Sequence, residues 1–262
     1  MTPKSTFKEF VKTIHSPEFS GVISVTQEHE IIIEDCNGYA DRVNKIKNTV
    51  DTRFAIASGT KLFTALGIMK LVEVGKLNLT DKAFEYIPKK FPTYNQDITI
   101  KHLLTHTSGL PDYYDEDELK DNITTIQSVP NHELRKPIDY LAIMPDKAMK
   151  FQPGEDFNYN NSAFILLAII IEQLTGDYHH FIDTQVLQPA HMTNSGFFKM
   201  NQLPQNTATG YIELENGEYK SNIYELPIIG GGDGGMYTTV KDMNCFWDSF
   251  VHGKIVNKDI VQ

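Results

Sequence analysis

Ser58 and Lys61 are the residues whose types and spacing point most directly to chemistry in this 262-residue chain. They stand three positions apart, and residues three apart are neighbours on a helix surface. Apolar residues then recur at every third or fourth position from Leu62 to Val72, the period of an amphipathic helix. A neutral lysine amine could take the proton of the serine hydroxyl, and free backbone N–H groups at the helix start would stabilise a developing oxyanion. The pair therefore predicts covalent catalysis through an acylated serine.

The Ser-x-x-Lys spacing has little specificity by itself, because about one match is expected by chance in a chain of this composition. A second match runs from Ser5 to Lys8. There the serine precedes an apolar stripe that includes Phe7 and Phe10, so it is interpreted as a helix N-cap or a fraying end. Ser58 could likewise be a capping serine, and the catalytic interpretation needs a partner motif.

A candidate partner is the tripeptide Tyr159-Asn160-Asn161, which precedes the apolar run Ala163 to Ile171. A tyrosine hydroxyl could relay a proton to a leaving group. An amide two residues later could orient a lysine and a substrate carbonyl. The alternative is structural, since a tyrosine and an asparagine before a helix are commonly a packed ring and a cap.

Periodicity predicts which elements must position these residues. Strand-like and helical segments follow one another in the order strands, helices, strands and a last helix; the strands are expected at 21–26, 31–36, 51–57, 195–198, 209–214 and 219–224, and the helices at 58–74, 99–105, 162–174, 177–186 and 239–251. The dipeptide Asn216-Gly217 is a strong hairpin signal between two of these strands. This order predicts an α+β fold, an antiparallel sheet flanked by helices with an inserted all-helical region. We expect residues 1–57 and 195–262 to form the sheet lobe and 58–194 the helical lobe, with the active site between them.

Composition limits the function classes. The net charge of −10 argues against a nucleic-acid partner, whose phosphates require clustered lysine and arginine. The acidic run Asp112 to Asp121 is interpreted as a solvated loop; a cation site there is the alternative, although the run lacks the EF-hand pattern. Cys36 and Cys245 suggest neither a disulfide framework nor a zinc site.

The sequence contains no apolar run of membrane-spanning length. Residues 2–10 are polar and do not resemble the apolar part of a signal peptide. We therefore expect either a cytoplasmic protein or an extracytoplasmic one whose export signal has been removed.

Taken together, the motifs resemble the penicillin-binding-protein and class C β-lactamase family of active-site serine hydrolases. The resemblance covers nearly the whole chain and rests on four ordered segments, which contain Ser-x-x-Lys, the HTSGL sequence, Tyr-x-Asn and a glycine-rich turn; they are residues 54–88, 98–113, 151–176 and 230–246. Several ordered matches are far more specific than one short motif. The resemblance implies the β-lactamase/transpeptidase-like fold.

The same resemblance implies roles for four residues. Ser58 would be the nucleophile and Lys61 its activating base. Tyr159 would protonate the leaving group and later activate the deacylating water, and Asn161 would position the substrate. No cofactor or metal is implied.

The chain departs from the family pattern in its third motif, Lys-Thr-Gly or His-x-Gly on a C-terminal strand. His252-Gly253-Lys254 follows a predicted helix, where Gly253 is interpreted as the C-terminal cap. We expect the C-terminal strands of the family fold to be missing from this sequence, because it ends at Gln262. Without them the sheet would have an unpaired apolar edge, which favours a shortened chain over a natural loss.

Other motifs suggest rival functions. His102 and His106 have a metal-binding spacing but lack the glutamate and third ligand of a zinc site, so structural histidines are favoured. The Gly230 to Gly235 run formally matches a dinucleotide motif, but Asp233 would place a negative charge in the phosphate cradle, which favours a flexible turn. No serine occurs in a G-x-S-x-G elbow, which argues against an ordinary α/β-hydrolase.

The sequence therefore predicts a metal-independent serine acyl hydrolase that attacks an amide or ester carbonyl through an acyl-Ser58 intermediate. The resemblance implies a D-alanyl-D-alanine carboxypeptidase or esterase-like activity, with a β-lactam, a D-amino-acid peptide or an ester as substrate. Two alternatives remain: a penicillin-binding sensor that is acylated without turnover, and a non-catalytic scaffold.

Overall fold

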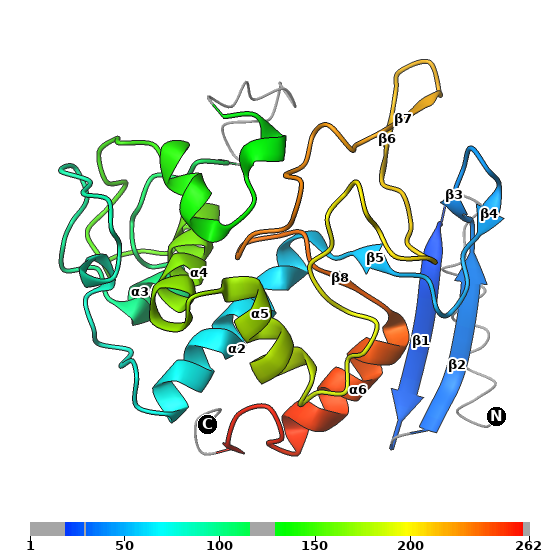
Figure 1. The fold of residues 1–262 in the computed structure, drawn as a ribbon, viewed down its shortest axis with the longest axis horizontal. Coiled ribbons are helices and arrows are strands. Elements are labelled where there is room, and N and C mark those ends of the chain that lie inside the picture. The colour runs from blue at the N-terminus through cyan, green and yellow to red at the C-terminus, as the bar shows by residue number, and fades with distance from the viewer. Residues whose placement is uncertain (1–18, 29, 116–128, 259–262) are drawn as a thin grey trace.

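The computed structural model describes residues 19–28, 30–115 and 129–258. The strands are β1 (Gly21–Gln27), β2 (Glu30–Asn37), β3 (Tyr39–Asp41), β4 (Ile46–Lys47), β5 (Phe54–Ala55), β6 (Tyr211–Glu213), β7 (Tyr219–Ser221) and β8 (Tyr237–Thr238). The helices are α2 (Thr60–Glu73), α3 (Ile100–Leu104), α4 (Asn161–Thr175), α5 (Tyr178–Ile182) and α6 (Val240–Val251). In Figure 1, β1 and β2 lie at one side, α3 and α4 at the other, and α2 and α6 between them.

The strands predicted at 21–26 and 31–36 are confirmed, and they form a hairpin. β1 pairs with β2 in antiparallel register from Gly21 opposite Asn37 to Gln27 opposite Glu30, with a bulge after Val25. Helix α6 packs against β1, where the Asn244 amide donates to the Ser24 hydroxyl over 3.1 Å. The hairpin is thereby joined to the helices.

The prediction of one antiparallel sheet is wrong for the described residues, which form four separate two-stranded ladders. The strand expected at 51–57 is reduced to β5, which pairs with β8. The strand expected at 195–198 is reduced to one bridge between Gly196 and Tyr237. The β6–β7 hairpin forms as Asn216-Gly217 predicts, with Gly217 at a φ of 78°, a left-handed value that glycine adopts readily.

Helix α4 is the centre of the core. Its residues 163–171 are fully or almost fully buried. The Asn160 side chain caps its start by accepting the Ala163 N–H over 2.7 Å, and Gly176, with a φ of 91°, ends it. The boundaries predicted from the sequence are confirmed. No helix in the described ranges is both long and apolar enough to cross a bilayer.

Helix α2 packs closely on α4 and α5 at Gly67. A Cβ atom there would lie 2.6 Å from Ile182 Cδ1 and 2.9 Å from Ile171 Cδ1, so the absence of a side chain lets these two isoleucines pack closely on α2. The start of α2, with Lys61, thereby comes to the start of α4. The division into lobes at residues 57/58 and 194/195 stays a prediction.

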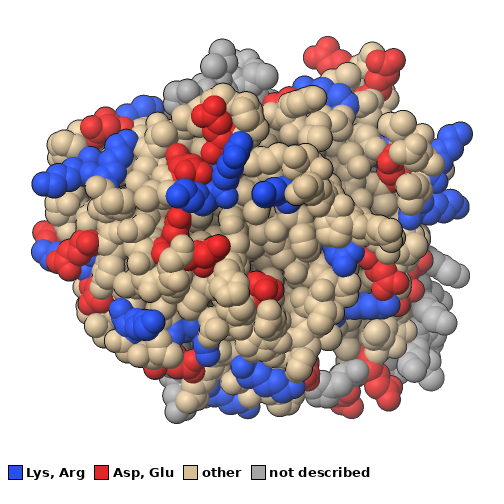
Figure 2. Space-filling model, in the orientation of Figure 1, with Lys and Arg blue, Asp and Glu red and all other residues tan. Residues whose placement is uncertain are grey.

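Acidic and basic side chains are intermingled on the face seen in Figure 2, and no broad basic field covers the described part of that face.

Candidate active site

Ser58 and Lys61 lie side by side, as their spacing predicts. Ser58 belongs to the short 3-10 turn Ala57–Gly59 immediately before α2, and Lys61 is in the first turn of α2. Lys61 Nζ is 3.1 Å from Ser58 Oγ. The serine is exposed, whereas Lys61 is only 6% exposed. A solvent-accessible hydroxyl therefore contacts a buried amine.

Three segments of the chain surround the Lys61 amine. Besides contacting Ser58, it donates to the Asn161 Oδ1 over 2.8 Å and to the Asp233 carbonyl over 2.8 Å. A neutral amine has two N–H donors and one lone pair. With both N–H groups given to these two oxygens, the lone pair is left to face the Ser58 hydroxyl. The arrangement suits an amine that accepts a proton from serine.

Asn161 is held in one orientation by its surroundings. Its Nδ2 donates to Asp112 Oδ2 over 3.1 Å and to the Tyr114 carbonyl over 2.9 Å. Because both acceptors lie on the nitrogen side of the amide, the oxygen side must point to Lys61.

Asp112 contacts the site residues, although the sequence pattern did not single it out. Its carboxylate accepts the backbone N–H groups of Asn161 and Ser162 over 2.6 and 2.9 Å, and the Ser162 hydroxyl over 3.1 Å. The prediction that Asp112 lies in a solvated acidic loop is therefore wrong. A carboxylate at a helix start accepts backbone N–H groups that lack partners within the helix, and its negative charge interacts favourably with the helix dipole. The rest of that run beyond Asp115, to Asp121, lies outside the described residues. Only the HTSGL-containing segment of the resemblance pointed to this region.

Tyr159 borders Lys61 from another side. Lys61 Nζ is 4.8 Å from the centroid of the Tyr159 ring, and the ring stacks on His106 with centroids 4.7 Å apart. Tyr159 is 37% exposed, and within the described ranges its hydroxyl makes no hydrogen bond to the protein. The hydroxyl is thus available to a bound molecule. All four residues predicted from the sequence come together.

The glycine-rich turn before β8 completes the surroundings. Its Met236 N–H donates to the Thr60 hydroxyl over 3.0 Å, and its Met236 carbonyl accepts the Ile56 N–H over 2.9 Å. A Cβ at Gly232 would lie 2.4 Å from Ala168 Cβ, so glycine here permits close packing on α4. The turn, rather than a dinucleotide cradle, is the structural role of this run.

Asp233 adds a carboxyl group behind Lys61. Tyr113 Oη donates to Asp233 Oδ2 over 2.6 Å. Burial raises the pKa of Asp233, and the nearby Lys61 charge opposes that rise. Burial and the Asp233 charge together hold the pKa of Tyr113 well above its ordinary value. From the sequence, Asp233 was expected only to oppose a phosphate in the glycine-rich run.

Backbone strain occurs next to Ser58. Ala57 has a φ of 44°, in the left-handed region that non-glycine residues seldom adopt. The contacts of Ile56 and Thr60 with the glycine-rich turn hold this conformation from both sides. Strain of this kind is concentrated at functional sites.

The rival motifs have structural partners. His102 Nδ1 accepts the Thr99 N–H over 3.2 Å in a capping box of α3. Gly253, with a φ of 72°, follows the end of α6, as expected for a helix cap. No group of three metal-binding side chains occurs in the described part of the chain.

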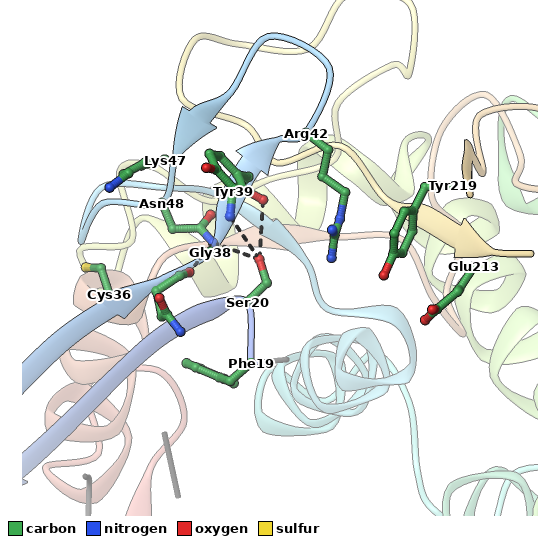
Figure 3. A pocket seen from close by; sticks show the side chains of 11 residues that line it. Phe19, Ser20, Cys36, Gly38, Tyr39, Arg42, Lys47, Asn48, Glu213 and Tyr219 are labelled. Atoms are coloured by element: carbon green, nitrogen blue, oxygen red, sulfur yellow. Dashed lines mark hydrogen bonds between the residues drawn. The ribbon is translucent and has the colours of Figure 1, made fainter. Parts of the chain in front are cut away.

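Two cavities in the described part of the chain lie away from Ser58. A polar cavity of about 700 Å³ lies between the β2–β4 region and the β6–β7 hairpin, where Ser20 binds the backbone of Tyr39, and Arg42 is 3.9 Å above the Tyr219 ring (Figure 3). A groove of about 1020 Å³ lies between β1 and α6. None of the four predicted site residues lines either one.

The chain is similar in sequence to known bacterial proteins. The chain is 36% identical over 193 residues to protein flp of Staphylococcus aureus strain MRSA252, covering 72% of this chain and 37% of that protein. It is 32% identical over 245 residues to the putative penicillin-binding protein PbpX of Bacillus subtilis strain 168, covering 92% of this chain and 57% of that protein. The chain thus spans between a third and three fifths of these relatives.

A solved structure matches the whole chain. The penicillin-binding protein from Bacillus halodurans superimposes with a TM-score of 0.84 at 40% sequence identity, over 100% of this chain and 76% of that one. The β-lactamase/transpeptidase-like fold is therefore established. The Beta-lactamase family model matches residues 5–259. Since that match covers nearly the whole sequence and contains the Ser58–Lys61 pair, the chain belongs to the Beta-lactamase family.

Proposed function

We propose that this protein is a serine acyl hydrolase that attacks an amide or ester carbonyl through an acyl-Ser58 intermediate, with D-alanyl-D-alanine carboxypeptidase or esterase-like activity. The observation that carries the proposal is the position of Lys61. Its amine contacts Ser58 Oγ over 3.1 Å while two carbonyl-type oxygens occupy its other bonding directions.

In the acylation step, neutral Lys61 takes the hydroxyl proton as Ser58 Oγ bonds to the carbonyl carbon. The negative charge moves to the carbonyl oxygen, near the backbone N–H groups at the start of α2. When the tetrahedral intermediate collapses, the amine or alkoxide leaves and takes a proton from Tyr159. The acyl group remains on Ser58, and Lys61 retains the serine proton until it is returned.

In the deacylation step, Tyr159 accepts a proton from a water molecule that attacks the ester carbon. The bond to Ser58 Oγ breaks, the serine regains its proton and the acid leaves. The exposure of Tyr159 and the free hydroxyl support this role. Asn161, fixed by Asp112 and the Tyr114 carbonyl, would hold the lysine amine beside Ser58.

Covalent labelling of Ser58 tests the proposal. A fluorescent penicillin should label the protein with one equivalent, and peptide mass spectrometry should find the adduct on Ser58. Ser58→Ala should abolish labelling while the protein stays folded by circular dichroism. A folded wild-type protein that forms no Ser58 adduct with penicillin, a p-nitrophenyl ester or a fluorophosphonate would contradict the proposal.

Turnover separates the enzyme from the sensor. Steady release of p-nitrophenol beyond one equivalent indicates a hydrolase. A burst of one equivalent followed by no release indicates a penicillin-binding sensor that is acylated without turnover.

A further inference from the structure

His106 contacts the segment that contains Tyr159 in three ways. Its ring stacks on the Tyr159 ring with centroids 4.7 Å apart and an interplanar angle of 30°. Its Nδ1 accepts the Asn160 N–H over 3.1 Å. Its carbonyl accepts the Asn158 N–H over 2.9 Å. One residue therefore binds the backbone on both sides of Tyr159 and covers a face of its ring.

The same ring belongs to a group of aromatic side chains beside Lys61. We call His106, Tyr159 and Phe164 the aromatic wall. The His106 and Phe164 centroids are 5.0 Å apart. Lys61 Nζ lies 4.8 Å from the Tyr159 centroid and 5.7 Å from the Phe164 centroid. A displacement of His106 would therefore change the position of the Tyr159 ring and the surroundings of the Lys61 amine.

His106 is suited to this place as a neutral ring. Burial, assisted by the Lys61 charge, lowers the pKa of His106 to about 4. Because Nδ1 accepts the Asn160 N–H, the proton of the neutral ring must be on Nε2. The ring thus supplies a flat surface and an acceptor without placing a positive charge beside Lys61.

We propose that His106 is a positioning residue for acyl transfer, holding Tyr159 beside Lys61 through ring stacking and through the Asn160 N–H bond. The inference rests on the proposed acyl-Ser58 function. A proton-transfer group displaced by about 1 Å from its productive position can lose a large part of its effect, even when all reacting groups are present.

Two variants separate the two contacts. His106→Asn keeps a side-chain acceptor near the Asn160 N–H and removes the ring. Asparagine also tolerates the left-handed backbone at this position, where φ is 57°. His106→Phe keeps a stacking ring and removes the acceptor. Each variant is first checked for folding by circular dichroism, and His102→Asn, in the capping box of α3, is the matched control.

The kinetic test is a double-mutant cycle with Tyr159→Phe, using a p-nitrophenyl ester and pre-steady-state mixing. In the wild-type background, His106→Asn should slow a Tyr159-dependent step, seen in kcat, by about tenfold to a hundredfold. In the Tyr159→Phe background, the same change should slow it less than about twofold, because the group that His106 positions is already gone. Equal effects in both backgrounds would show a general structural role and overturn the proposal.

A spectroscopic test does not depend on activity. In protein with ¹³C-labelled tyrosine rings, the Tyr159 signal is identified by its loss in Tyr159→Phe. It should shift in His106→Asn, because the ring current of the stacked imidazole is removed, and change little in His102→Asn. An unshifted Tyr159 signal would refute the placement of His106. If the Tyr159 signal shifts in His106→Asn but the wild-type protein never forms an acyl adduct, the contact between His106 and Tyr159 stands. The catalytic positioning is then refuted together with the proposed function.

Discussion

The Lys61 amine is held in place by residues that are distant from one another in the sequence. Its three partners come from the turn before α2, the start of α4 and the glycine-rich turn. The first was predictable from the sequence, because helical spacing alone brings Ser58 to Lys61. The Asp233 carbonyl was not, since a backbone oxygen has no signature in residue types.

At the residue scale, Lys61→Met should leave the fold intact and slow covalent labelling of Ser58 by about 10²–10⁴-fold, because the general base is removed. Labelling is measured as the rate of adduct formation by intact-protein mass spectrometry. Lys70→Met is the matched control on the same helix, where Lys70 pairs with Glu73. Equal labelling rates in Lys61→Met and wild type would exclude Lys61 as the base.

Asp112 allows a second prediction about one side chain. Asp112→Asn replaces an acceptor oxygen with an N–H group that faces the donors of Asn161 and Ser162. The free energy of unfolding should fall by about 1–3 kcal/mol, and labelling of Ser58 should slow because Asn161 loses its fixed orientation.

Asp97→Asn is the control for that change. Asp97 pairs with Lys82 on the surface and is 75% exposed, so its loss should change the free energy of unfolding far less than the loss of the Asp112 carboxylate. Urea unfolding of both variants, beside labelling kinetics, makes the comparison. An Asp112→Asn protein with wild-type stability and labelling would leave the carboxylate without the role assigned to it.

At the element scale, the helices were predictable and the sheet was not. The apolar run of α4 and its flanking Asn160 and Gly176 encode both ends of the helix locally. The β5–β8 pairing joins residues 54–55 to 237–238, two residues from each side, and so short a ladder leaves no periodic pattern. The contacts of Asp112 were likewise not predictable from local sequence, because it binds the start of a helix 49 residues later in the chain.

Packing of the glycine-rich turn against α4 gives a third prediction. In Gly232→Ala, the new Cβ would approach Ala168 Cβ to 2.4 Å and the Phe164 carbonyl oxygen to 2.5 Å. The backbone must move, so the free energy of unfolding should fall by about 1–3 kcal/mol. Because this turn supplies the Asp233 carbonyl to Lys61, labelling of Ser58 should slow as well.

Gly234→Ala tests whether that effect is specific. Its Cβ would meet nothing nearer than the Ala57 carbonyl oxygen at 3.6 Å, an ordinary contact. We expect a change in the free energy of unfolding within about 0.5 kcal/mol. Similar melting temperatures for the two alanine variants would mean that the turn is not packed as described.

At the scale of the whole molecule, acid should destabilise the fold partly through His106. Its pKa is about 4 in the folded protein and near 6.5 when unfolded. Between these values the unfolded chain takes up a proton that the folded protein does not, so stability falls as the pH decreases through this window. The contribution lost between pH 7 and pH 5 is about 2 kcal/mol.

Urea unfolding at pH 7 and pH 5 measures the change in the free energy of unfolding to which His106 contributes. In His106→Asn the difference between the two pH values should shrink by that amount, because the titrating group is gone. Asp233 acts with the opposite sign: its raised pKa favours the folded state at low pH, and that stabilisation is lost as the pH rises through the folded value. An unchanged pH dependence in His106→Asn would contradict the lowered pKa of His106.

The three-way attachment of Lys61 has a consequence for when the serine becomes reactive. Its partners are separated from it by 3, 100 and 172 positions along the polypeptide. Under the proposed function, we expect the Ser58 hydroxyl to emerge early during synthesis and to stay unreactive, since the last oxygen that orients the amine follows much later. A covalent probe of Ser58 would accordingly report the completion of folding, because it would label only molecules in which these three segments are already in contact.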